Sequence, residues 1–393
     1  MNLASRLDRL RGQAADPGSE PLAQGIRRAR RHPGTQASLP ARFPVLAEAL
    51  GADCETDGLL VRRREYTLSG CGLKMSDLSS LPEVCDLHAP DWVYIDTETT
   101  GLSGGAGNLA FMVGAARYTD ERRLEVRQYV LGSFASEARM LRELFDWVGS
   151  DAVLVSYNGK CFDLPLLIGR LRMHRINATP GVSRHLDLMY SVRRAYRRHW
   201  PDCRLQTAER RLLGLSRVGD LPGAEAPAAW QSWLREGDTR QLLRVLEHNY
   251  QDVVSLALLH QRLPMDYAGS GRADLDHAAI GRAWRDAGRD DLARRVWEFA
   301  GSRLDAHGSL QLARLYRQQR QWRLARAVWQ RLHARGNAEA ALELSKYYEH
   351  RRRDYQRALG FLRYCEGPGL AARYARLQDK VECNLQLPLL PLA

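Results

Sequence analysis

Two carboxylates separated by one residue, Asp96 and Glu98, follow the apolar run Trp92-Val93-Tyr94-Ile95. The run predicts a buried strand, and in an extended strand residues i and i+2 point to the same face. Two like charges held this close repel one another unless a cation or a shared proton compensates them. The usual compensation is a hard divalent ion, because Mg²⁺ and Mn²⁺ prefer oxygen ligands. The alternative is a solvated strand end that carries two surface acids.

A third acid, Asp163, follows a predicted strand at 152–157 and a turn that contains Asn158 and Gly159. An aspartate at this place could simply cap the helix expected over 164–174, or it could join the first two acids. His248 and Asp252 lie four residues apart in a helix expected over 239–262, and therefore on one helical face. That pair suits a metal ligand beside a general base that takes a proton from water, and a surface ion pair is the alternative.

Together these acids match the needs of a two-metal phosphoryl-transfer site, in which carboxylates from several elements hold two ions about 3.5–4 Å apart. Three strings then carry a resemblance to known enzymes: Asp96-Thr97-Glu98-Thr99-Thr100-Gly101-Leu102-Ser103-Gly104-Gly105, Asn158-Gly159-Lys160-Cys161-Phe162-Asp163 and His248-Asn249-Tyr250-Gln251-Asp252. They resemble the exonuclease motifs of the DEDD superfamily, which are 3′–5′ exonucleases on the ribonuclease H-like fold. They look closest to the YprB-like predicted bacterial exonucleases, in which tetratricopeptide-like repeats follow the nuclease domain. The resemblance covers roughly residues 55–265, and the repeat architecture extends it to the end of the chain.

The resemblance implies a role for each matching residue. Asp96, Glu98, Asp163 and Asp252 would hold two Mg²⁺ or Mn²⁺ ions, and His248 would orient or deprotonate the attacking water. The substrate-binding residues would be Thr99, Leu102, Asn158 and Phe162, with Leu102 wedged against the terminal base. The third motif departs from the better-known patterns, which place a Tyr four residues or a His five residues before the last Asp. Tyr250 and His185 therefore remain rival candidates for the general base.

The elements that must position these residues read as a mixed α/β pattern. Strands expected at 93–95, 109–118 and 124–131 have short connections and predict an antiparallel meander. An amphipathic helix over 136–148 with Ser136 as N-cap comes next, followed by the continuous apolar strand at 152–157. Further helices are expected over 164–174, 190–199, 205–213 and 239–262. We therefore expect an α/β ribonuclease H-like domain, a mixed sheet flanked by helices.

The last third of the chain repeats with a period of about 32 residues and predicts an all-α domain. Aromatic residues recur at Trp284, Tyr316 and Tyr348, and alanines at Ala293 and Ala325. We expect the run Arg351-Arg352-Arg353 to add one residue in a loop, so that Ala358 occupies the same place in its repeat as Ala325 does. This period is similar to that of tetratricopeptide-type helical hairpins, while chance spacing in an ordinary helical domain is the alternative.

The length of 393 residues predicts more than one domain. We expect a basic arm at 1–45, either a mobile tail or a contact surface, and an extension at 46–90 that packs on the nuclease domain. The nuclease domain would span 91–265, the helical repeats 272–385, and an apolar tail 386–393. One segment at 191–200 (SVRRAYRRHW) mixes arginines with aromatic residues and either follows nucleic acid or places its aromatics in the core.

The formal charge of +12 favours an anionic partner, nucleic acid first. The seven scattered cysteines indicate a reducing compartment and no zinc site, and no run of about 18 apolar residues occurs. These features predict a cytoplasmic protein with no membrane contact, and the repeats could bind a protein partner. The sequence thus predicts a metal-dependent nuclease, a 3′–5′ exonuclease on DNA or RNA. An inactive nucleic-acid- or protein-binding scaffold and a structure-specific endonuclease on the same fold are the alternatives.

Overall fold

The computed structural model describes residues 42–54, 58–68, 75–88, 91–101, 107–177, 184–217, 219, 221–365 and 367–385. Leu102, nearly all of the predicted basic arm and the predicted tail at 386–393 lie outside these residues. Among the described residues, no helix combines the length and the apolar character needed to cross a membrane.

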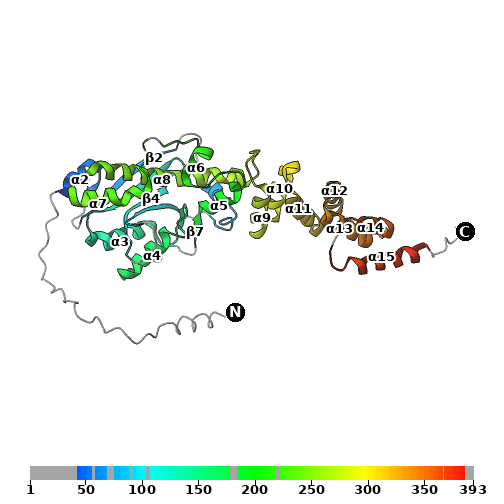
Figure 1. Ribbon diagram of the computed structural model, residues 1–393. Coiled ribbons are helices and arrows are strands. Elements are labelled where there is room, and N and C mark those ends of the chain that lie inside the picture. The colour runs from blue at the N-terminus through cyan, green and yellow to red at the C-terminus, as the bar shows by residue number, and fades with distance from the viewer. Residues whose placement is uncertain are drawn as a thin grey trace, which may run out of the picture. The chain divides into compact units, whose positions relative to one another are not determined.

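A mixed sheet lies among the helices of the part of the chain up to Tyr267 (Figure 1). It has seven strands, in the order β1-β2-β5-β4-β3-β6-β7. The strands are β1 (Asp53–Cys54), β2 (Leu59–Thr67), β3 (Trp92–Thr99), β4 (Ala110–Tyr118), β5 (Arg123–Leu131), β6 (Val153–Ser156) and β7 (His185–Asp187). The meander β3-β4-β5 is antiparallel, as predicted, and β2 extends it by pairing antiparallel with β5. On its other side β3 pairs parallel with β6, which pairs parallel with β7. The segment predicted as an extension therefore contributes a full strand to the sheet.

Both faces of the sheet are covered, which explains why β3 and β6 are continuously apolar rather than alternating. Trp92 and Tyr94 of β3 enter one core, and Val93 and Ile95 enter the other. The first core takes in α5 (Leu188–Tyr196) and the C-terminal part of α8 (Thr239–Tyr267). The second takes in α2 (Arg42–Leu50), α3 (Glu137–Val148), α4 (Asp163–Met173), α7 (Ala226–Glu236) and the N-terminal part of α8.

Helix α8 packs across β3, β4 and β5, and it carries the third motif over the strand that carries the first. It ends at Tyr267, beyond the predicted end of the helix at residue 262. The predicted helix at 205–213 is α6 (Leu205–Ala208) continued by a π-helical turn, Glu209–Leu213. Ser136 does occupy the N-cap position of α3, but its hydroxyl donates to the Ser133 carbonyl instead of capping the helix.

The C-terminal region consists of paired helices followed by a last helix, as the period predicted. The pairs are α9 (His277–Asp286) with α10 (Asp290–Ala300), α11 (Ala306–Gln318) with α12 (Trp322–His333), and α13 (Ala338–Tyr347) with α14 (Tyr355–Leu362); α15 (Leu370–Leu385) follows. The repeated alanines Ala293, Ala325 and Ala358 are all fully buried. The expected extra residue falls in a π-helical turn, Tyr348–Arg352, that extends α13. The tetratricopeptide assignment of these pairs stays a prediction.

Hydrogen bonds join the first helical pair to the sheet domain. The indole Nε1 of Trp284 donates to the Tyr267 carbonyl at 2.9 Å, and the Asp276 amide donates to the Ala195 carbonyl at 2.8 Å. In the predicted basic segment, the rings of Tyr196 and Trp200 are buried and stacked 4.1 Å apart. They belong to the core, and they cannot stack on nucleotide bases.

Candidate active site

Asp96 and Glu98 lie near the C-terminal end of β3, opposite Gly114 and Met112 of β4. The pairing shifts between Glu98 and Thr99, an irregularity that ends the regular ladder directly after the second acid. Glu98 is buried and Asp96 is half-buried. The strand therefore holds both carboxylates at its end rather than on a solvated surface.

An amide from α8 holds the Asp96 carboxylate. Asn249 is fully buried, and its Nδ2 donates to Asp96 Oδ2 at 2.9 Å. Its Oδ1 accepts from Gln128 Nε2 at 3.0 Å, and the same nitrogen donates to the Leu246 carbonyl at 2.7 Å. Gly114 leaves room for this amide, since a Cβ there would lie 2.2 Å from Asn249 Oδ1. The sequence reading missed Asn249, although it directly follows His248 in the third motif.

Asp163 is the first residue of α4, and its carboxylate accepts a hydrogen bond from the Thr97 hydroxyl on β3. The N-cap of α4 is Phe162, which makes no side-chain capping bond. The acid is thus tied to the strand that carries Asp96 and Glu98. Burial raises the pKa of Asp163 to about 6, and the Thr97 bond opposes that rise.

The electrostatics of Asp96 show that the four acids act on one another. Its pKa is raised well above the usual value, first by burial and then by repulsion from Asp252, Asp163 and Glu98. The hydrogen bond from Asn249 works in the opposite direction. Since repulsion of this kind requires proximity, the fold brings together four acids that come from β3, α4 and α8.

Asp252 and His248 are joined by a residue that the sequence reading did not single out, Arg217. One guanidinium nitrogen, Nη2, donates to Asp252 Oδ1, and Nη1 lies 3.3 Å from His248 Nδ1. The imidazole Nε2 lies 3.4 Å from Asp252 Oδ2. Burial raises the pKa of Asp252, while the charge of Arg217 and its hydrogen bond to Asp252 oppose that rise.

The turn of the second motif is held by Asp187, which is the last residue of β7 and is buried. Its carboxylate accepts from the amides of Asn158 at 2.8 Å and Lys160 at 3.1 Å. Asn158 adopts a left-handed conformation with φ of 69°, which asparagine tolerates better than most residues. A Cβ at Gly159 would lie 2.4 Å from Ser156 Oγ and 3.0 Å from Asp163 Oδ2. Gly159 therefore lets this turn approach Asp163 closely.

His185 and Tyr250, the other two candidates for the general base, make different contacts. His185 Nε2 lies 2.8 Å from the Ser156 hydroxyl, and burial lowers the pKa of His185 to about 4. The ring of Tyr250 lies under the guanidinium of Arg64, 3.7 Å from its carbon, and burial raises the pKa of Tyr250. Of the three candidates, His248 is the one paired with Asp252.

The predicted substrate-binding residues differ in exposure and in hydrogen bonding. Phe162 is 53% exposed, whereas the Thr99 hydroxyl donates to the Gly101 carbonyl at 2.9 Å. Leu102 lies outside the described residues, so its predicted wedge role stays a prediction.

The residues fit a hard divalent cation by their chemistry, because four carboxylates offer only oxygen donors. Within the described ranges, however, no group of three or more His, Cys, Asp or Glu side chains is arranged to hold a metal ion. The Arg217 guanidinium lies against Asp252, where a ligated cation would need the same oxygen. The predicted ligands therefore lie close together, but they are not arranged to bind a metal ion.

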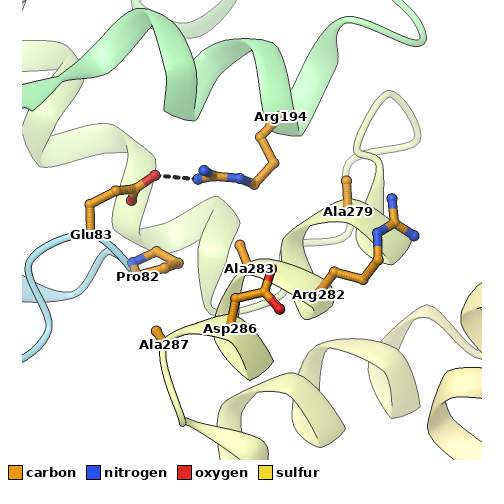
Figure 2. Close-up of a pocket in the computed structure, with 8 residues that line it drawn as sticks. All are labelled: Pro82, Glu83, Arg194, Ala279, Arg282, Ala283, Asp286 and Ala287. Atoms are coloured by element: carbon orange, nitrogen blue, oxygen red, sulfur yellow. Dashed lines mark hydrogen bonds and ion pairs between the residues drawn. The ribbon is translucent and has the colours of Figure 1, made fainter. Parts of the chain in front are cut away.

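A cavity of about 430 Å³ lies elsewhere, between the loop after residue 81, α5 and α9 (Figure 2). Arg194 pairs there with Glu83, and the lining also includes Arg282 and Asp286 (Figure 2). Two cations and two carboxylates leave the cavity without net charge, and none of the four gathered acids lines it.

Comparison with known proteins finds sequence similarity in this part of the chain. Residues 93–264 match the family model described as the RNase_H superfamily. This stretch of the chain is therefore similar to the RNase H superfamily. The chain is also 34% identical over 187 residues to the uncharacterized protein YprB of Bacillus subtilis (strain 168). That match covers 47% of this chain and 45% of the relative, so the chain spans under half of the relative's length.

Among solved structures, a match is the family B DNA polymerase from the hyperthermophilic archaeon Pyrobaculum calidifontis, at 13% identity and a TM-score of 0.38. The match covers 72% of this chain and 36% of the polymerase, and we infer nothing from so slight a likeness. The residues that match the RNase_H superfamily model contain all four acids and His248, and the match ends within α8.

Proposed function

We propose that this protein is a metal-dependent nuclease that hydrolyses phosphodiester bonds of DNA or RNA, and specifically a 3′–5′ exonuclease. The observation that carries the proposal is the mutual repulsion of acids that come from β3, α4 and α8. Buried like charges of this kind cost free energy unless a cation binds among them. The RNase H-like fold of residues 93–264 and the charge of +12 support nucleic acid as the partner.

In this proposal Asp96, Glu98, Asp163 and Asp252 hold two divalent ions, Mg²⁺ or Mn²⁺. When bound, such ions stabilise the developing charge on the phosphate and lower the pKa of a bound water. Asn249 and Thr97 orient the carboxylates of Asp96 and Asp163 through the hydrogen bonds described above. These two bonds fix the orientation of two of the four carboxylates before a cation binds.

His248 accepts the proton of the attacking water at Nδ1. Its other nitrogen, Nε2, faces Asp252 Oδ2 at 3.4 Å, and that carboxylate stabilises the imidazolium that forms. On the substrate side, the exposed ring of Phe162 stacks on the terminal base, and Asn158 and Thr99 line the same pocket. Leu102 wedges against that base, and the C-terminal helical pairs offer a surface to a protein partner.

The test is a nuclease assay of the purified full chain with Mn²⁺ and end-labelled single- and double-stranded DNA and RNA. We expect release of mononucleotides from the 3′ end, and loss of cleavage in Asp96→Asn and Asp252→Asn. Asp151→Asn, at an exposed acid outside the site, is the matched control and should cleave normally. Unchanged cleavage in the first two variants would refute the site assignment.

Circular single strands separate the two nuclease types, because only an endonuclease can start on a closed strand. Cleavage of circles would replace the exonuclease assignment by the endonuclease. Nucleic-acid binding without any Mn²⁺ binding would instead favour the inactive scaffold.

A further inference from the structure

Arg217 makes a set of contacts that joins the candidate site to a buried acid outside it. Its Nε and Nη2 donate to the two oxygens of Glu209 at 2.7 and 2.6 Å. Its Nη2 also donates to Asp252 Oδ1, and its Nη1 reaches His248 Nδ1. The side chains of Arg217 and Glu209 are 6% and 1% exposed, so solvent screens these charges little.

The bidentate pair with Glu209 fixes where the guanidinium lies. Glu209 stands at the start of the π-helical turn after α6, and Arg217 follows that turn and Gly214, which has φ of 69°. A planar guanidinium held by two parallel bonds cannot rotate without losing one of them. Arg217 therefore presents its remaining donors to Asp252 and His248 in a defined geometry.

The contact with His248 also fixes the hydrogen-bond role of the imidazole. A guanidinium has donors only, so Nδ1 must be the acceptor. The lone pair of Nδ1 is thus occupied, and the ring proton lies on Nε2, facing Asp252 at 3.4 Å. While Arg217 holds this position, its guanidinium occupies Nδ1 of His248.

We propose that Arg217 is a positioning residue that occupies Asp252 and His248 before the metal binds, and that a divalent cation must displace it from both. This inference rests on the proposed function, since it takes Asp252 as a metal ligand. The guanidinium neutralises Asp252 in the absence of metal and keeps the base blocked. Binding of the cation at Asp252 removes the reason for the contact, and Arg217 keeps its bidentate bond to Glu209 alone.

The test is calorimetric titration of the full chain with Mn²⁺. Arg217→Gln alone would leave Glu209 buried without a partner, so the variant is the double substitution Glu209→Gln with Arg217→Gln. We expect it to bind Mn²⁺ at least tenfold more tightly than the wild type, because the competing cation is gone. The matched control is Glu137→Gln with Arg170→Gln, a buried pair in the same domain, which should bind Mn²⁺ as the wild type does.

The variant Asp252→Asn distinguishes a failure of the proposed metal site from a failure of the Arg217 inference. If that variant binds Mn²⁺ like the wild type, Asp252 is not a ligand and the proposed metal site fails. If it loses binding while the Glu209/Arg217 double variant binds no more tightly than the wild type, only the Arg217 inference is overturned.

A crystal structure of the wild-type protein soaked with Mn²⁺ gives a second measurement that needs no variant. We expect the Arg217 guanidinium to have left Asp252 and His248 while still bonding Glu209. An ion bound on Asp252 with the Arg217–Asp252 bond intact would contradict the inference, as would a soaked crystal with no ion at Asp252.

Discussion

Replacing Asn249 by Ala tests whether the contact between α8 and β3 is what holds Asp96 in place. The change removes the donor to Asp96 Oδ2 at 2.9 Å and the acceptor for Gln128 Nε2 at 3.0 Å. A bond to a carboxylate contributes roughly 1.5–3 kcal/mol and a neutral bond about 1 kcal/mol. Gln128 keeps its bond to the Leu246 carbonyl, so part of the second contribution survives. We therefore expect a loss of about 2–3 kcal/mol in the free energy of unfolding.

Urea denaturation of the metal-free protein, followed by tryptophan fluorescence, measures this loss. Mn²⁺ titration of the same variant should show weaker binding, because Asp96 is no longer oriented. Asn337→Ala is the matched control: it removes the N-cap of α13, whose Oδ1 accepts from the Ala340 amide at 2.8 Å. That variant should lose about 1 kcal/mol with no change in Mn²⁺ affinity. A variant at Asn249 with wild-type urea midpoint and Mn²⁺ affinity would refute the reasoning.

Three further changes probe other parts of the chain. Gly114→Ala places a Cβ 2.2 Å from Asn249 Oδ1, and overpacking of this kind should cost roughly 1–3 kcal/mol by urea denaturation. Gly281→Ala places a Cβ 2.1 Å from Trp297 Nε1 and should loosen the α9–α10 pair by a similar amount, visible as a changed tryptophan emission spectrum. Burial lowers the pKa of His260 to about 3, so the folded protein keeps this ring neutral while the unfolded chain protonates it below about pH 6.5. The free energy of unfolding should therefore fall by up to roughly 5 kcal/mol as pH drops from about 6.5 to 3. His260→Gln should remove that part of the pH dependence. An equal dependence of the free energy of unfolding on pH in both proteins would contradict this expectation.

The local spacing of the acids was enough to predict which residues share a face. Asp96 and Glu98 share a strand face, and His248 and Asp252 share a helix face, because both periods are properties of the backbone alone. The prediction that the 93–95, 109–118 and 124–131 strands form an antiparallel meander succeeded for the same reason, since short connections leave few alternatives. The roles of these residues stay predictions that the proposed assays test.

The residues that the sequence did not reveal act across long separations. Arg217 lies in an irregular stretch after a π-helical turn, where no period marks one arginine among many. Strand β2 pairs with β5 although the two are far apart in the sequence, as the Leu59–Leu131 register shows. Helix α7 and the three-residue β7 were not predicted, the second because so short a strand carries no alternation. Asn249 could have been found, because the side of α8 that faces the sheet must fill the space left by Gly114.

The balance of charge around the four acids bears on whether the domain is a nuclease or an inactive scaffold. Repulsion from Asp252, Asp163 and Glu98 raises the pKa of Asp96, while the charge of Arg217 lowers the pKa of Asp252. Amide side chains at the same positions would keep the hydrogen bonds from Asn249 and Thr97 without the repulsion, and a scaffold would be more stable with them. Oriented carboxylates that destabilise the metal-free fold are what a cation-binding site requires, because the cation recovers that free energy when it binds. The repulsion therefore supports the proposed cation site over an inactive scaffold.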